Sequence, residues 1–267
     1  MPGNCMTSLA LPVVALALSL AVGQVPALTA GEDSRSGEFF EYEVHWAGML
    51  VGRVNVYNHG MTTRADRPCQ KLEAYARTDG PIETLYEAKM RYLGFLHPDS
   101  SSWLYEEWEK DKDWRLQEWL EFPDGLSVVK RFKKGKLRNE VAVPPGTLDP
   151  VGAVYRLFSV SLNPGDHHEV TVSQGKDLYL ATVDVAPGPP LDSLFGAVRT
   201  VEVIPKIYYK GKPLGKRTMK AWFTADERRV PVRLWADVEY GSFSSELVKY
   251  RPPCQNPGTE PILTLRK

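Results

Sequence analysis

The chain has 267 residues, of which 43% are hydrophobic, and its 33 basic and 33 acidic side chains cancel to a formal net charge of zero. This balance excludes the one-signed basic stripe that is typical of nucleic-acid-binding proteins. The roughly 235 residues that follow residue 30 suit one large β domain or two small ones, and the lack of a low-complexity linker favours one.

The N-terminal segment is predicted to be a signal peptide over residues 1–30. It carries no charged side chain, and its apolar run from Leu9 to Val22 has the length of a secretory h-region but is short for a transmembrane span. Small residues at Ala27 and Ala30 offer two cleavage sites, which the sequence does not rank. The alternative is an uncleaved membrane anchor. We expect a periplasmic or otherwise exported protein with no stable transmembrane span after cleavage.

The chain after the leader is patterned as β-strands. Phe40, Tyr42, Val44 and Trp46 alternate with polar residues, which is typical of a strand with one wet face. With a turn at Ala47-Gly48 and a second alternating run, residues 39–58 are predicted to form a hairpin. Further strands are expected at 70–77, 86–93, 103–109, 114–122, 126–133, 169–173, 178–185, 198–209, 217–224, 230–240 and 242–250. Their short turn-like links favour antiparallel connections.

One short helix is predicted near residues 149–160. Asp149 is placed as its N-cap and Pro150 at its first position. The residues expected on its apolar face are Val151, Val154, Tyr155 and Phe158. The sequence thus predicts an all-β, mainly antiparallel fold, either a strongly curved sheet or an incomplete β-barrel, with this helix capping the concavity. We place a single β domain at 31–250 and a Pro-rich tail at 251–267.

Several segments together resemble the bacterial exported family known as domain of unknown function 3108. They are Tyr42–Gly48 followed by Val51-Gly52, the Asp149-Pro150 helix, Pro164–Asp166, Trp222–Leu234 and Gly241–Leu247. The resemblance implies a periplasmic or envelope location and a fold similar to lipocalin-like barrels or curved-sheet lipoprotein carriers. It supplies no established activity and no catalytic residues. Relatives tend to have a small hydroxyl residue where this chain has Gly152, which implies a slightly less stable helix.

The cysteine content predicts a disulfide. After removal of the leader only Cys69 and Cys254 remain, and an oxidising compartment favours their pairing. This bridge would attach the C-terminal tail to an early strand.

No residue pattern indicates catalysis, a metal or a cofactor. The adjacent His167 and His168 point to opposite faces of a strand and are unsuited to chelating one ion. Glu106, Glu107, Glu109, Asp111 and Asp113 could supply a carboxylate pair for acid–base chemistry, but a solvated hairpin turn is the favoured interpretation. We therefore expect a protein that is not an enzyme.

Aromatic residues are the more informative signal. By strand alternation Trp103 and Tyr105 share one face, Trp108 lies on the other, and Trp114 and Trp119 lie on opposite faces. These rings could form the core, line a groove for a hydrophobic ligand, or contact a protein. The leading hypothesis is a periplasmic protein that binds a lipid or lipoprotein acyl chain in the concavity. The alternative is an envelope scaffold or adaptor that acts through contacts with an envelope protein.

Overall fold

The computed structural model describes residues 35–110, 113–214, 218–238, 241–253 and 263–264. The N-terminal half contains β1 (Phe39–Trp46), β2 (Met49–Arg64), β3 (Arg67–Thr78), the 3-10 turn η1 (Gly80–Thr84), β4 (Lys89–Leu96), β5 (Ser102–Lys110), β6 (Trp114–Glu121), β7 (Val128–Lys133) and β8 (Lys136–Ala142). The helix α2 (Pro150–Ser159) follows. After it come β9 (His167–Gln174), β10 (Asp177–Pro187), β11 (Leu191–Ser193), β12 (Gly196–Val198), β13 (Thr200–Tyr209), β14 (Lys212–Pro213), β15 (Thr218–Thr224), β16 (Pro231–Val238), β17 (Gly241–Arg251) and β18 (Leu263–Thr264).

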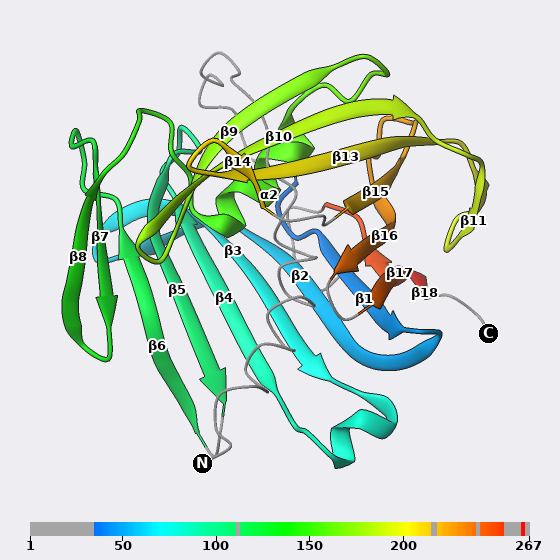
Figure 1. Cartoon of the computed structure of the whole chain (residues 1–267), viewed down its shortest axis with the longest axis horizontal. Helices are drawn as coiled ribbons and strands as arrows, with labels where there is room; N and C mark the ends of the chain where they lie inside the picture. Colours follow the sequence, from blue (N-terminus) through cyan, green and yellow to red (C-terminus); the bar gives the residue numbers. More distant parts are fainter. Residues whose placement is uncertain (1–34, 111–112, 215–217, 239–240, 254–262, 265–267) are drawn as a thin grey trace.

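One large curved sheet dominates the molecule (Figure 1). Its main path runs β8-β7-β6-β5-β4-β3-β2-β1-β17-β16-β15-β13-β10-β9, and neighbouring strands along this path are antiparallel. Because β8 and β9 are its two ends and are not paired with each other, the sheet does not close into a barrel. The predicted fold class, a strongly curved antiparallel sheet with one short helix, is confirmed.

Local sequence sets the tight turns that make this meander. Ala47-Gly48 has φ of 49° and 82°, and Lys134-Gly135 has φ of 52° and 75°. Two successive positive φ values define the two-residue turn whose twist matches that of the flanking strands, and glycine adopts the second position without strain. These turns join β1 to β2 and β7 to β8.

Several predicted strand bounds are wrong. The strand expected at 86–93 is Lys89–Leu96, because η1 extends the connection from β3 and Thr78 bonds across to Ala88. The edge strand β8 was not predicted, since its charged residues do not form an apolar stripe. The small β11–β12 hairpin was missed too, because three-residue strands carry too little periodicity to detect.

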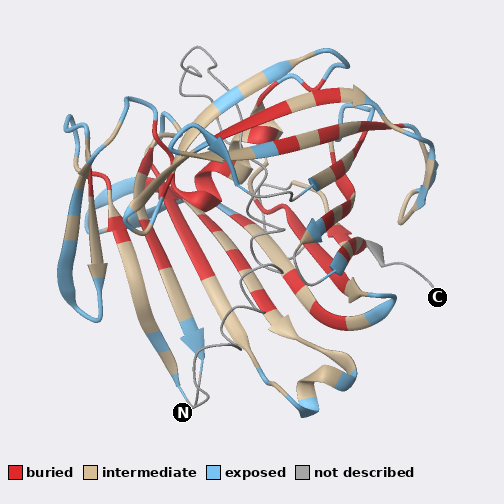
Figure 2. Ribbon diagram, in the orientation of Figure 1, coloured by how far each residue is buried: buried red, intermediate tan, exposed pale blue. Residues whose placement is uncertain are grey.

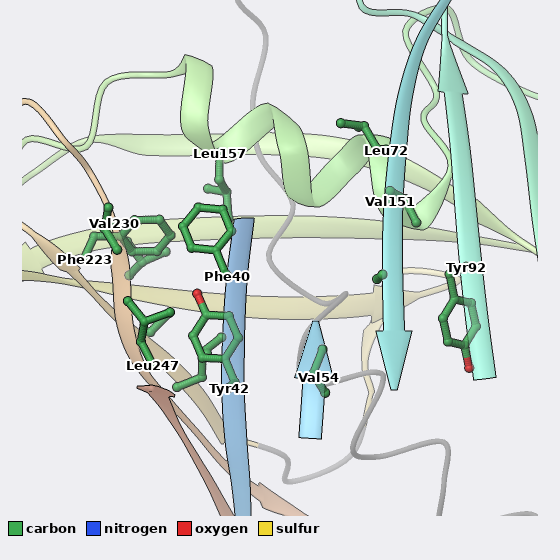
Figure 3. Packing of buried hydrophobic residues seen from close by; sticks show 14 of the residues in the cluster. Phe40, Tyr42, Val54, Leu72, Tyr92, Val151, Leu157, Phe223, Val230 and Leu247 are labelled. Carbon is green, nitrogen blue, oxygen red and sulfur yellow. The ribbon is translucent and has the colours of Figure 1, made fainter. Parts of the chain in front are cut away.

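The helix α2 lies inside the curve of the sheet, between the β1–β5 portion and the β9–β13 portion (Figure 1). Buried residues line the side of the sheet that faces it (Figure 2). In Figure 3, Leu157 points from α2 toward Phe40, and both belong to the main cluster of buried side chains. The concave face around α2 is therefore the core of the protein, and we treat it as the candidate site.

Candidate functional site

The N-terminal end of α2 is fixed to the sheet by a buried polar clamp. Asp149 is fully buried, and its Oδ1 accepts hydrogen bonds from the backbone N–H groups of Val151 (2.8 Å) and Gly152 (2.9 Å). The Ser102 hydroxyl of β5 donates to Asp149 Oδ2 (2.6 Å) and accepts from the Asp149 N–H (2.8 Å). Burial raises the pKa of Asp149, and these hydrogen bonds oppose that rise. The clamp combines an N-cap with a side-chain contact to a strand distant in sequence.

Two glycines allow α2 to approach the sheet closely. A Cβ on Gly152 would lie 2.9 Å from Asp149 Oδ2 and 2.9 Å from Leu96 Cδ2. A Cβ on Gly94, in β4, would lie 3.0 Å from the Cβ of Val151. Gly152 is thus explained by packing: the space that a side chain would need is occupied by the clamp and by β4.

Substitution of Gly152 with alanine is expected to lower the free energy of unfolding by about 1 kcal/mol. Alanine gains about 1 kcal/mol in helix propensity, but overpacking a tight core typically costs 1–3 kcal/mol. Chemical denaturation of both proteins would measure the difference. A net stabilisation would show that the contact between α2 and β4 relaxes without cost.

The C-terminal half of α2 covers a small apolar cavity. About 30 Å³ of space is lined by side chains of β1, β2, α2, β15, β16 and β17: Phe40, Tyr42, Val54, Val56, Val154, Leu157, Phe158, Phe223, Pro231, Leu234 and Ser245. Tyr42 and Ser245 are the lining residues that carry a hydroxyl, and the Tyr42 hydroxyl donates to the Pro231 carbonyl (2.8 Å). A space of this size holds about one water molecule, so the cavity is nearly filled by protein.

Phe158 is the largest side chain that α2 contributes to this cavity. Its ring is only partly buried and lies 5.6 Å from the ring of Phe40 and 6.1 Å from that of Phe223. The Arg35 guanidinium covers it from outside at 4.5 Å, and this arginine is itself held by two hydrogen bonds to buried Glu38.

The residues predicted to cap the concavity are brought together by α2. Val151 packs against β4, Val154 and Phe158 line the cavity, and Tyr155 packs against the main core cluster. Sequence reasoning missed Leu157, which is fully buried, and Ala153, which packs against Ala181 of β10. A helix enclosed by a curved sheet is buried on more than one stripe, so a single amphipathic face underestimates its contacts.

A second group on the inner face is polar and lies on β5, β6 and β7. Arg131 donates to both carboxylate oxygens of Glu118 (2.8 and 2.7 Å) and to Asn139 Oδ1 (3.2 Å). Glu107 lies directly across the strand pair from Glu118. Burial, followed by the charge of Glu118, raises the pKa of Glu107 to about 7.

The expectation that this acidic segment is a solvated hairpin turn is wrong for Glu106, Glu107 and Glu109. All three lie within β5. Glu109 is exposed, whereas Glu106 is buried on the face opposite to Glu107 and bonded to Arg64 and to the Trp108 indole. Asp113 is exposed, and Asp111 lies outside the described residues. The strand predicted at 103–109, and not the turn interpretation, therefore describes Glu106, Glu107 and Glu109.

Trp103 faces the outside of the curve, whereas Tyr105 belongs to the inner core cluster. The expectation that they share a face is wrong. Two consecutive residues of β4, Phe95 and Leu96, pair with Leu104 and Ser102 of β5, and Trp103 between these two has no partner in β4. Trp103 is thus the extra residue of a β-bulge, which redirects its side chain. It packs with Phe95, and Trp108 joins the same outer cluster.

The expectation that Trp114 and Trp119 lie on opposite faces is also wrong, because β6 contains a second bulge. Gln117, between Leu116 and Glu118, has no register partner in β5, so the two tryptophans lie on the same, outer face. Trp119 stacks on Phe132 at 4.7 Å, and the Arg91 guanidinium lies 4.8 Å from the Trp114 ring. All four candidate tryptophans therefore face away from α2, and of the five aromatic candidates only Tyr105 faces the concavity.

The remaining predicted residues are placed as follows. Cys69 is buried in β3, but Cys254 lies outside the described residues, so their disulfide stays a prediction. His167 and His168 point to opposite sides of β9, toward Asp184 and the Ser161 carbonyl respectively. Within the described ranges there is no cluster of three or more potential metal ligands, and no helix has the length and hydropathy to cross a membrane.

Comparison with known proteins identifies a family and a fold. A family model described as protein of unknown function (DUF3108) matches residues 41–248. None of the curated proteins matches the sequence. The crystal structure of a β-barrel-like protein of domain of unknown function DUF1849 from Brucella abortus superposes with a TM-score of 0.54 at 15% identity, covering 82% of this chain and 98% of that one.

Two other solved structures are more distant. A candidate exported protein with a YmcC-like fold from Bacteroides fragilis gives a TM-score of 0.34 at 11% identity, covering 82% of this chain and 97% of that one. A candidate lipoprotein from Parabacteroides distasonis gives 0.33 at 11% identity, covering 85% and 100%. The Brucella abortus protein thus shares the β-barrel-like fold.

Proposed function

Because the chain belongs to the DUF3108 family of proteins of unknown function, its role has to be inferred from its own geometry, and we propose that it is an exported, non-catalytic protein that binds an apolar chain. The ligand class is the acyl chain of a lipid or lipoprotein. The chain would enter between the C-terminal half of α2 and the concave face of the sheet. Export is inferred from the charge-free leader over residues 1–30.

The observation that carries this proposal is the apolar cavity closed by Phe158. Apart from Ser245 its lining is aliphatic or aromatic. Its 30 Å³ is far below the 300–1,000 Å³ of typical ligand sites, so the proposal requires that the Phe158 side chain moves to make room for the chain. Each methylene that is buried contributes about 0.8 kcal/mol, so a chain of several methylenes offsets displacement of the Phe158 ring.

The clamp at Asp149 supports this mode of binding. It holds the N-terminal half of α2 against β4 and β5 through buried hydrogen bonds, whereas Val154, Tyr155 and Phe158 are only partly buried. A ligand can therefore displace side chains of the C-terminal half while the helix stays attached to the sheet.

Substitution of Phe158 with alanine is expected to raise the affinity for a dodecanoyl probe at least fivefold, because the ligand no longer has to displace the ring. Titration calorimetry with dodecanoate and native mass spectrometry would measure binding. Calorimetry is preferred to quenching of intrinsic tryptophan fluorescence, because four of the seven tryptophans, Trp103, Trp108, Trp114 and Trp119, lie on the outer face and would dominate the signal.

Phe132 provides the matched control, because Phe132→Ala makes the same chemical change on the outer face, where the ring stacks on Trp119. This variant should bind dodecanoate like the wild type. Circular dichroism would verify that both variants are folded. Absence of dodecanoate binding to both the wild type and Phe158→Ala would refute the proposal.

A further inference from the structure

A second hollow lies outside the core, on the outer face of β9, β10 and β13. It encloses about 550 Å³, within the range of ligand-binding sites. Its lining includes Glu169 and Thr171 of β9, Leu180 of β10 and Tyr208 of β13, with Pro144 of the β8–α2 linker completing it. We call this hollow the β9 groove.

The β9 groove borders an open edge of the sheet. β9 is the last strand of the sheet path. The backbone N–H and C=O groups of its even-numbered residues point toward β10: His168 pairs with Val183, and in the same register the Val185 N–H donates to the Asp166 carbonyl. The odd-numbered residues therefore direct their backbone groups away from β10. Among the described residues, no backbone partner pairs with the N–H and C=O groups of His167 and Glu169.

The same edge already pairs with one extended residue of the chain. The Leu148 N–H donates to the Thr171 carbonyl, and the Ser173 N–H donates to the Leu148 carbonyl, both at 2.9 Å. This parallel bridge ends at once, because Asp149 caps α2. Upstream of Leu148 the linker carries Pro144 and Pro145, which have no N–H to donate. Leu148 therefore forms backbone hydrogen bonds with Thr171 and Ser173, and no corresponding described residue does so with the edge-facing backbone groups of His167 and Glu169.

The side chains around this edge favour a segment with a basic residue. Both carboxylate oxygens of Asp184 have hydrogen-bond partners: Oδ1 lies 2.6 Å from His167 Nδ1, and Oδ2 accepts from Lys206 Nζ (2.7 Å). Glu169 is 57% exposed, and its described ion pair, to His167, is longer at 3.3 Å. The carboxylate next to the open backbone groups is therefore the one available to a ligand, and Leu180 and Tyr208 offer an apolar surface beside it.

We propose that the β9 groove binds an extended peptide segment of a partner protein, which adds a strand to the edge at His167 and Glu169. The segment carries a basic residue opposite Glu169 and an apolar residue against Leu180 and Tyr208. Backbone hydrogen bonds supply most of the affinity, as in other cases of strand addition. This site is independent of the cavity beneath α2, so it does not depend on the proposed acyl-chain binding.

The test is a selection with a displayed library of random linear peptides of about twelve residues, long enough to cross the groove in extended form. Full-length protein is the bait, and Glu169→Pro is the counter-selection. The proline removes the edge-facing N–H without breaking the ladder to β10, a position where an edge strand tolerates it. Glu169→Ala is the matched control, because it removes the side chain and keeps the backbone donor.

Enriched peptides are expected to lose at least about tenfold in affinity against Glu169→Pro. Against Glu169→Ala they should lose less than about fivefold, since an exposed ion pair contributes little. Hydrogen exchange should slow at the amides of His167 and Glu169 when peptide binds, and not at the other sheet edge, β8. Failure to enrich any peptide, equal binding to the proline and alanine variants, or protection confined to other strands would overturn the proposal. Dodecanoate binding should be unchanged in Glu169→Pro, so the two proposals fail separately.

Discussion

Replacing Asp149 with alanine is expected to lower the free energy of unfolding by about 3 kcal/mol. The substitution removes an N-cap, which costs about 1 kcal/mol. It also leaves the N–H groups of Val151 and Gly152 and the hydroxyl of Ser102 buried without their acceptor, and each unsatisfied buried group costs about 1–3 kcal/mol. Partial relaxation of α2 keeps the total below the sum of these costs.

Chemical denaturation of the wild type, Asp149→Ala, Ser102→Ala and the double variant would measure this effect and its coupling. We expect a coupling energy of at least about 1 kcal/mol, because the Ser102 hydroxyl donates to the Asp149 carboxylate in a fully buried hydrogen bond. Asp149→Asn keeps the acceptor oxygen for the backbone N–H groups and should lose less than the alanine variant. A loss below about 1 kcal/mol for Asp149→Ala would mean that α2 is held by apolar packing alone.

Glu107 is expected to make stability fall as the pH rises from about 4.5 to 7. Its carboxyl ionises near its ordinary pKa of 4.5 in the unfolded chain but near 7 in the folded protein, where burial and Glu118 disfavour the charge. The folded state therefore binds the proton more tightly, and this contribution is fully present below pH 4.5 and lost as the pH passes 7. The gap corresponds to up to about 3 kcal/mol.

Substitution of Glu107 with glutamine should remove this dependence. The variant should resemble the wild type near pH 4 and exceed its free energy of unfolding by up to about 3 kcal/mol near pH 8. Urea denaturation across this range would measure the difference. Glu140, exposed on the edge strand β8, is the control, since Glu140→Gln should leave the pH profile unchanged. A constant difference between Glu107→Gln and wild type at all pH values would show that Glu107 titrates alike in both states.

Asp149 and Glu107 both lie beside or on β5. Asp149 fixes α2 where the helix meets β4 and β5, and Glu107 lies among polar groups on β5–β7 that are bridged by Arg131 and Glu118. An apolar chain that enters beside Phe158 therefore finds a hydrophobic region under α2 and a charged region further along the same face. The proposed ligand is consistent with this division, because lipids and lipoproteins join an acyl chain to a polar group.

The helix and the turns could be predicted because each depends on residues adjacent in sequence. Asp149 followed by Pro150 specifies a helix start, and Ala47-Gly48 specifies a two-residue hairpin turn, whatever surrounds them. The open antiparallel sheet followed from the same local signals, since short links leave little alternative to a meander. The role of Gly152 could not be predicted, because it depends on Leu96, more than fifty residues earlier.

The sequence by itself determined the strand pattern, the helix and the curved antiparallel architecture, because alternation, caps and turn residues act within a few positions of the chain. Only the tertiary structure decided which side of the sheet each aromatic ring occupies. The bulges at Trp103 and Gln117 each shift the alternation by one residue, and a bulge is defined by how a strand pairs with its neighbour, which the alternation of a single strand does not reveal. For that reason the tryptophans expected around the concavity lie outside it, and the candidate site is formed instead by α2, Phe40 and Phe223.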